Sequence, residues 1–319
     1  MTKWTLLINL IRFVVAVGLV ALVLAHANIN QVFSALRSAN LLLVVAALGC
    51  LAVTVLCNAI RWRAIVSLQT PGLSIPAAIL GTFEGMFFNL FLPTSVGGDV
   101  GRAYRAFDKG IPLGVAVQSG IIDRALGLLA VGTLLLVGCG FDPRIMALSW
   151  FWVVEAVAVA GLLGGVTVVV LGNVLHPDRL PRWLGSLVTL AKSFGDTIAT
   201  RRFVTELLPL TLIGNLVNCL ALWLCARATF NQVGGLDAVM ALEASSLAAL
   251  VPVSIGGWGV REGATALIFA AVGNPTDSSV AAALVYGVVL ILIGLFGAAV
   301  WLLDPYRRSI RTGKPDKVG

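Results

Sequence analysis

The sequence predicts an all-α polytopic membrane protein. Of its 319 residues, 59% are hydrophobic and only 12% are charged, whereas soluble proteins carry about 25% charged residues. The mean hydropathy is +0.98, and many apolar runs approach the roughly 20 residues that a helix needs to cross a bilayer. These runs are continuous and lack the apolar and polar alternation of a membrane β-barrel. Helical spans are therefore the expected architecture.

Six apolar runs are expected to be full spans, and two further apolar runs lead into glycine-rich breaks. We expect these two runs, Ile75–Leu92 and Ala238–Val251, to belong to helical hairpins that enter the membrane and return. The N-terminal stretch Lys3–Ala27 resembles a signal peptide. Because further spans follow it, we interpret it as a retained helix. The expected full spans are Leu7–Leu24, Leu41–Ala59, Val115–Val137, Ser149–Gly172, Leu207–Ala226 and Ser279–Leu303.

The two glycine-rich breaks share one pattern. The first reads FLPTSVGGDVGRAYRA from Phe91, and the second reads LVPVSIGGWGVREGA from Leu250. Six positions match at a constant offset of 159, which is half of the chain. We interpret this match as an internal duplication. The matched pairs are Pro93 with Pro252, Ser95 with Ser254, Gly97 with Gly256, Gly98 with Gly257, Arg102 with Arg261, and Glu84 with Glu243.

Basic residues predict the orientation, because Lys and Arg accumulate in cytoplasmic loops. If each run that leads into a break returns to the face from which it entered, most basic residues face the cytoplasm, Arg61 and Arg105 among them, and both termini are cytoplasmic. Only Arg37, Arg144 and Arg227 then face outward. The two re-entrant hairpins enter from opposite faces in this arrangement. The sequence thus predicts an inverted repeat, which in many transporters places a site near the midplane of the membrane.

A single transmembrane domain, residues 1–319, is expected. Repeat one covers about 41–172 and repeat two about 207–303, and a basic cytoplasmic tail occupies 304–319. Between the repeats, residues 178–203 combine apolar residues at helical spacing with Arg and Lys. This pattern predicts either an amphipathic helix on the anionic inner leaflet or a linker packed under the bundle.

Each break is expected to interrupt a helix inside the bundle. Pro93 and Pro252 cannot donate to a helix ladder, and the paired glycines that follow them allow positive φ and close backbone approach. In hydrocarbon, backbone of this kind is tolerated only where protein or a water-filled cavity covers it. The breaks should therefore lie away from lipid.

A new helix with an arginine in its first turn is expected after each break. Asp99 is a good N-cap for the helix of Arg102, and the helix beginning near Trp258 carries Arg261 and Glu262. The start of a helix attracts anions, so two opposed half-helices would aim N–H groups and arginines at one point. We predict a site there for the phosphate or carboxylate of a lipid head group. Packing alone is the alternative, but duplication together with charged residues favours function.

Other polar residues in the apolar regions are candidates for the same site. Asp123 and Arg124 either pair with the break or form a structural ion pair. Glu84 and Glu243 are expected to share a role, which is proton binding or pairing with an arginine. No metal site and no cofactor is predicted. The candidate substrate-binding residues are Arg102, Arg261, Asp99, Glu262, Glu84, Glu243, Ser95, Ser254, Trp258, Asn89, Asp123 and Arg124, with Pro93, Gly97, Gly98, Pro252, Gly256 and Gly257 as backbone of the breaks.

Three segments carry a resemblance to a known family. NLFLPTSVGGDVGRAYRA, IIDRALGLLA and PVSIGGWGVREG are similar to the lysylphosphatidylglycerol synthase transmembrane-domain family, also called flippase-like, and the resemblance covers about Leu41–Leu303. It implies a bacterial or archaeal inner-membrane protein that moves a polar lipid between leaflets. In multidomain relatives the module precedes a soluble aminoacyltransferase domain. No residues here resemble that domain, so we expect no lysyl transfer.

The expected function is therefore translocation of a polar or anionic lipid. The alternatives are a membrane-embedded transferase for a lipid-linked substrate and an accessory subunit that positions a lipid-modifying enzyme. The sequence shows no metal cluster, no DxD-type carboxylate pair and no phosphate-binding loop, which argues against the transferase. The expected partners are a membrane lipid and, for the accessory alternative, a lipid-modifying enzyme. Nucleic acid is not expected.

Overall fold

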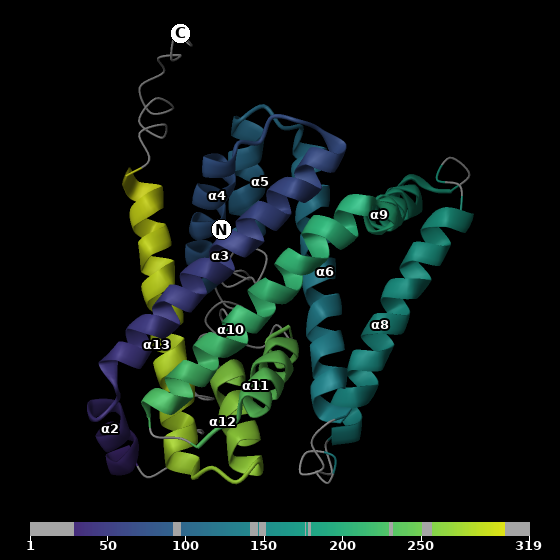
Figure 1. Cartoon of the computed structure of the whole chain (residues 1–319). Coiled ribbons are helices and arrows are strands. Elements are labelled where there is room, and N and C mark those ends of the chain that lie inside the picture. The colour runs from purple at the N-terminus through teal and green to yellow at the C-terminus, as the bar shows by residue number, and fades with distance from the viewer. Residues whose placement is uncertain are drawn as a thin grey trace, which may run out of the picture.

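The computed structural model describes residues 29–91, 97–140, 146, 151–175, 177, 180–229, 232–250 and 257–303. Long helices dominate this part of the chain (Figure 1). Five of them contain stretches long and apolar enough to cross a membrane, which confirms a multi-pass helical membrane protein. They correspond to five of the six expected spans and are α3 (Leu41–Gln69), α6 (Leu113–Gly140), α8 (Phe151–Val174), α10 (Leu208–Ala228) and α13 (Thr276–Leu303).

Some of the predicted features lie outside the described residues. These are the span Leu7–Leu24, the tail 304–319, Arg144, and Pro93, Ser95, Pro252, Ser254 and Gly256 of the breaks. The helices on both sides of each break are described. The first break lies between α4 (Ile75–Phe91) and α5 (Gly97–Asp108), and the second between α11 (Gly235–Ala248) and α12 (Val260–Ala271). The chain therefore leaves one helix and begins another at each predicted interruption.

Helices α4 and α5 form a tight antiparallel pair around Gly98. A Cβ atom added to Gly98 would lie 2.3 Å from the carbonyl oxygen of Gly85 and 2.6 Å from the Asn89 side chain. The Gly98 N–H donates to Asn89 Oδ1 at 2.8 Å, so Asn89 satisfies a donor at the start of α5. The prediction that Asp99 is the N-cap is wrong. Because α5 begins at Gly97, Asp99 lies inside its first turn, where its carboxylate binds other side chains.

The start of α12 depends on two glycines in the left-handed region. Gly257 has φ +77° and Gly259 has φ +81°, values that L side chains rarely adopt. The Gly259 N–H donates to Glu262 Oε2 at 2.7 Å, which closes the first turn. The helix therefore begins at Val260, two residues after Trp258.

Helices α3 and α10 run side by side in opposite directions across the bundle (Figure 1). Near their middle, Thr54 Oγ1 donates to the carbonyl oxygen of Gly214 at 3.2 Å. At one end, the Asn40 N–H before α3 donates to the carbonyl oxygen of Ala228, the last residue of α10, at 3.0 Å. A short π-helix, η2 (Phe203–Leu207), leads into α10.

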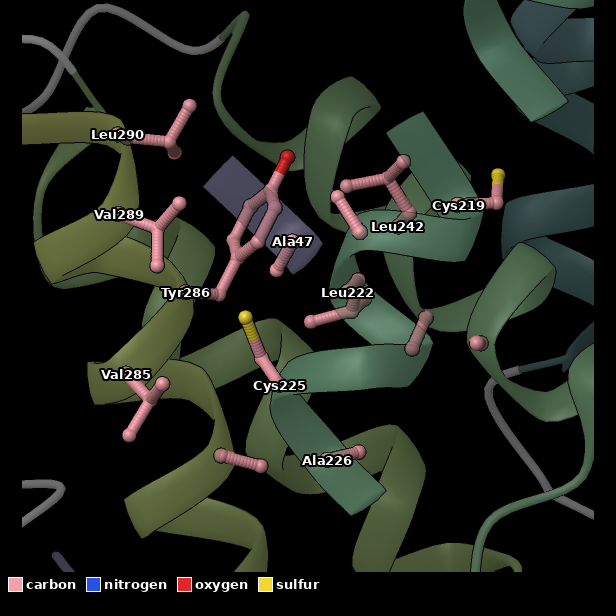
Figure 2. Close-up of a cluster of buried hydrophobic side chains, with 14 of the residues drawn as sticks. Ala47, Cys219, Leu222, Cys225, Ala226, Leu242, Val285, Tyr286, Val289 and Leu290 are labelled. Carbon is pink, nitrogen blue, oxygen red and sulfur yellow. The ribbon is translucent and has the colours of Figure 1, made fainter. Parts of the chain in front are cut away.

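The other helices pack around this central pair. Helix α4 packs against α13, and α11 packs against α6. An apolar cluster joins α3, α10, α11 and α13, and Figure 2 shows its members around the ring of Tyr286. Cys225 and Leu222 of α10 lie beside that ring, and Cys219 lies farther along the same helix.

Helices α8 and α9 (Arg182–Ala199) lie at one side of the bundle (Figure 1). Helix α8 packs against α6 and α9. Phe194 of α9 is buried in a cluster with Ile65 and Ile122, whereas Trp183 and Leu187 at its other end are 67% and 56% exposed. Helix α9 therefore has one end packed on the bundle and one end with outward-facing apolar side chains. Helix α2 (Ile29–Arg37) packs against α13.

Candidate functional site

Charged side chains from α3, α5 and α6 form a continuous chain of ion pairs, here called the charge chain. Arg61 Nε donates to Asp123 Oδ1 at 2.7 Å, and Arg102 Nη1 donates to Asp123 Oδ2 at 3.0 Å. Arg102 Nη2 also donates to Asp99 Oδ1, and Arg124 Nε donates to Asp99 Oδ2. The order along the charge chain is Arg61, Asp123, Arg102, Asp99 and Arg124.

The charge chain leads from the interior toward an accessible end. The side chains of Arg61 and Asp123 are 6% and 4% exposed, those of Arg102 and Asp99 are 10% and 16% exposed, and that of Arg124 is 36% exposed. Buried charges are tolerated only when they are paired and hydrogen-bonded. The alternation of sign explains how several ionised groups can lie together inside an apolar bundle.

A second ion pair lies on the same helices. Arg105 Nε donates to Glu84 Oε2 at 2.8 Å and Arg105 Nη2 donates to Glu84 Oε1, a bidentate arrangement with both side chains buried. Arg105 follows Arg102 by one helical turn, so both project from one side of α5. The charge chain and this second pair together contain four cations and three anions among the residues that the structure describes. The cations of this cluster are Arg61, Arg102, Arg105 and Arg124, and its anions are Glu84, Asp99 and Asp123.

An aromatic ring holds the guanidinium of Arg102 from another side. The guanidinium carbon lies 5.2 Å from the ring centroid of Trp62, close enough for a cation–π interaction. Trp62 is fully buried, and its Nε1–H donates to Ser119 Oγ at 3.2 Å. Arg102 is thus fixed by two carboxylates and one ring.

The second half holds its arginine in a simpler way. Arg261 Nη2 and Nε donate to Glu262 Oε1 at 2.7 and 3.2 Å, and the guanidinium carbon lies 5.6 Å from the ring centroid of Trp258. Glu262 is 2% exposed, and the Arg261 side chain is 15% exposed. Each half therefore presents one arginine that is held by a carboxylate and a tryptophan.

The partners of these arginines do not follow the repeat. At the offset of 159, Asp99 corresponds to Trp258, and Glu262 corresponds to Ala103. At the same offset, the other charged members of the cluster correspond to apolar residues in the second half. Arg61 corresponds to Leu220, Asp123 to Ala282, Arg124 to Ala283 and Arg105 to Ala264.

The repeated glutamates do not share their partners either. Glu84 is held by Arg105, whereas Glu243 on α11 is 1% exposed and accepts a hydrogen bond from Cys219 Sγ of α10 at 3.5 Å. Among the described residues, the Cys219 thiol is the only hydrogen-bond partner of the Glu243 carboxyl group. The two positions therefore offer different chemistry although they match at the offset of 159.

Comparison with known families decides what kind of protein carries this site. A family model described as the lysylphosphatidylglycerol synthase TM region matches residues 9–297. The chain belongs to this family. The match covers both breaks and all of the charge chain, and it confirms the resemblance seen in the sequence. A search of curated proteins finds no match.

Most of the predicted site residues that the structure describes lie in two sets of contacts. Asp99, Arg102, Asp123 and Arg124 lie in one set of contacts, while Arg261, Glu262 and Trp258 form another. Ser95 and Ser254 lie outside the described residues. Among the residues described, no group of three or more His, Cys, Asp and Glu side chains is arranged to hold a metal ion.

Sequence reasoning missed Arg61 and Arg105 as members of the site. The charge count placed both at the cytoplasmic face, but they are 5% and 8% exposed and are engaged in ion pairs. Two signals were available. The apolar helical pattern continues past Arg61 through Trp62, Ile65 and Val66, and Arg105 lies one turn after Arg102.

Proposed function

We propose that this chain moves a lipid with an anionic head group between the leaflets of the inner membrane. The observation that carries the proposal is the position of Asp99, whose two carboxylate oxygens bridge Arg102 and Arg124 at the accessible end of the charge chain. A phosphate group offers oxygens of the same kind to the same two guanidinium groups. The family's connection with phosphatidylglycerol, a lipid with a phosphate, supports this choice of substrate class.

Asp99 is proposed to occupy the head-group position when no lipid is bound. The lipid phosphate then displaces the Asp99 carboxylate, while Arg102 stays held by Asp123 and Trp62. The start of α5 adds only about 0.3–1 kcal/mol to anion binding at an exposed site, and up to roughly 2 kcal/mol when partly buried. The arginines should therefore dominate.

Arg261 is proposed to play the corresponding part in the second half. It is held by Glu262 and lies against Trp258, as Arg102 is held by Asp99 and lies against Trp62. A lipid crossing the membrane would pass from the arginine of one half to that of the other. Ser95, Ser254 and Asn89 are proposed to line this route.

The inverted repeat is proposed as the framework for this movement. Three features of the packing support it. Helix α4 packs against α13 as its counterpart α11 packs against α6, and the counterparts α3 and α10 run antiparallel. Helix α3 ends at Gln69 and α10 at Ala228, a difference of 159. In this proposal both termini are cytoplasmic and residues 1–319 form one domain.

The short helices are proposed to be re-entrant. Helices α5 and α12 have 12 residues each, which gives a length of about 18 Å at the usual helical rise. The hydrocarbon core of a bilayer is roughly 30 Å thick. A helix of this length reaches into the membrane from one face without crossing it.

A vesicle assay tests the proposed function. Purified protein is placed in vesicles that carry fluorescent phosphatidylglycerol or fluorescent phosphatidylcholine, and a membrane-impermeant quencher reports how fast inner-leaflet label reaches the outside. We expect faster exchange of phosphatidylglycerol than in protein-free vesicles, with a smaller effect on the zwitterionic lipid. Exchange no faster than in protein-free vesicles would contradict the proposal. A new lipid product in the mass spectrum would favour the transferase alternative.

A further inference from the structure

The repeat leaves one buried glutamate without the arginine that its counterpart has. Glu84 is bound by both Nε and Nη2 of Arg105. The position that corresponds to Arg105 in the second half is Ala264, on α12, which packs against the α11 helix of Glu243. The duplication therefore kept the carboxyl group in both halves and the cation in only one.

Other charged groups near α11 are engaged elsewhere. Helix α11 packs against α6, α10 and α12. On α10, the Arg227 guanidinium lies 5.7 Å from the ring centroid of Trp223, and on α11 itself Asp237 Oδ2 accepts the Gly234 N–H at 2.9 Å. On α12 and α6, the charged groups are those of the two sets described above, namely Arg261, Glu262, Asp123 and Arg124.

The chemistry of this position favours a proton on Glu243. The residue is 1% exposed, and the Cys219 that contacts it lies beside the buried Leu242 of the apolar cluster (Figure 2). An ionised carboxylate in such surroundings is strongly disfavoured unless a cation compensates for it. Cys219 Sγ donates to Oε1, which leaves Oε2 as the atom that carries a proton.

We propose that Glu243 is the proton-binding site of the transporter and couples lipid movement to a proton gradient. The inference rests on the proposed function. When the second half opens to water on one side, a proton forms an O–H bond with Oε2, and when that half opens to the other side the same bond breaks and the proton leaves to water. No electrons are transferred. Glu84 is not part of this proposal, because both of its carboxyl oxygens already accept hydrogen bonds from Arg105.

The first test is an infrared measurement that does not depend on transport. Purified wild-type protein near neutral pH should show the carbonyl absorption of a protonated carboxylic acid. Glu243→Gln should lose this band, and the matched variant Glu84→Gln should keep it. Ala264→Arg, which supplies the missing cation while retaining Glu243, should also lose the band. A band that is unchanged in Glu243→Gln would overturn the proposal.

The second test uses vesicles with labelled phosphatidylglycerol and an imposed pH gradient. Wild-type exchange should become several-fold faster in one direction of the gradient, and Glu243→Gln should lose this acceleration. Wild-type exchange that is equally fast with and without the gradient would overturn the coupling while leaving the proposed function intact. If no exchange occurs at all, the proposed function fails, and the infrared result alone decides whether Glu243 holds a proton.

Discussion

Asp123 on α6 accepts a hydrogen bond from Arg102 on α5 at 3.0 Å, and both side chains are buried. The other oxygen of the same carboxylate accepts from Arg61 on α3 at 2.7 Å. The Asp123 carboxylate thus links α3, α5 and α6. It also balances the charges of two buried guanidinium groups. The charge chain is therefore as much a part of the packing of the bundle as of the proposed site.

Removing the charge of Asp123 should destabilise the protein. Breaking a buried ion pair by changing one partner typically costs about 3–5 kcal/mol, because the remaining charge stays buried without compensation. We expect Asp123→Asn to lower the unfolding temperature of the detergent-solubilised protein clearly. Asp196→Asn, at an exposed position of α9, is the matched control and should unfold like the wild type. Equal unfolding temperatures for the two variants would show that the charge chain contributes little to stability.

A methyl group at Gly98 should disturb the pairing of α4 and α5. The added Cβ atom would lie 2.3 Å from the carbonyl oxygen of Gly85, so the two helices must separate. Gly120 on α6 is the control, since a Cβ atom there meets nothing within 4 Å. We expect Gly98→Ala to lower the yield of folded protein and Gly120→Ala to leave it near the wild-type level. Size-exclusion chromatography in detergent measures both, and a normal elution profile for Gly98→Ala would count against the close contact.

The proposed inverted repeat predicts that two basic residues lie on opposite sides of the membrane. Lys109 follows α5 and is expected in the cytoplasm, while Arg227 at the end of α10 is expected outside. Single cysteines at these positions, in a variant without native cysteines, can be probed in intact cells with a membrane-impermeant maleimide. We expect labelling at position 227 and protection at 109 until the cells are opened. The same behaviour at both positions would refute the proposed orientation.

Much of the fold could be predicted from the sequence because membrane spans are long and uniformly apolar. Five predicted spans reappear as helices with similar bounds, and one helix ends and another begins at each predicted interruption. The ends were less predictable, since α3 continues to Gln69, ten residues beyond the expected end at Ala59. Arg61 was expected to face the cytoplasm beyond the end of the span. Its pairing with Asp123 instead allows the helix to continue with the arginine buried.

The candidate site was predictable in its residues and less so in its partners. The repeat identified Arg102, Arg261 and the two glutamates, but it also suggested that matched residues share one role. The neighbouring helices correspond in the two halves, but the residues on them differ. Arg105 corresponds to Ala264 and Cys219 to Ile60. Glu84 therefore pairs with Arg105, while Glu243 accepts a hydrogen bond from Cys219. The matched positions are predictable from the sequence, whereas the contacts of each side chain depend on residues that do not match.

The most direct test of the central claim is the effect of Arg102→Lys and Arg261→Lys on phosphatidylglycerol exchange in vesicles. Lysine keeps the positive charge but cannot bind a phosphate with two parallel N–H groups. Arg202→Lys is the matched control, because Arg202 lies at an exposed position where it pairs with Glu206. We predict that exchange falls at least several-fold in each of the two site variants, with normal folding, and stays at the wild-type rate in the control. Wild-type exchange in both site variants would contradict the account, since the arginines would then serve only as counter-ions for Asp99 and Glu262.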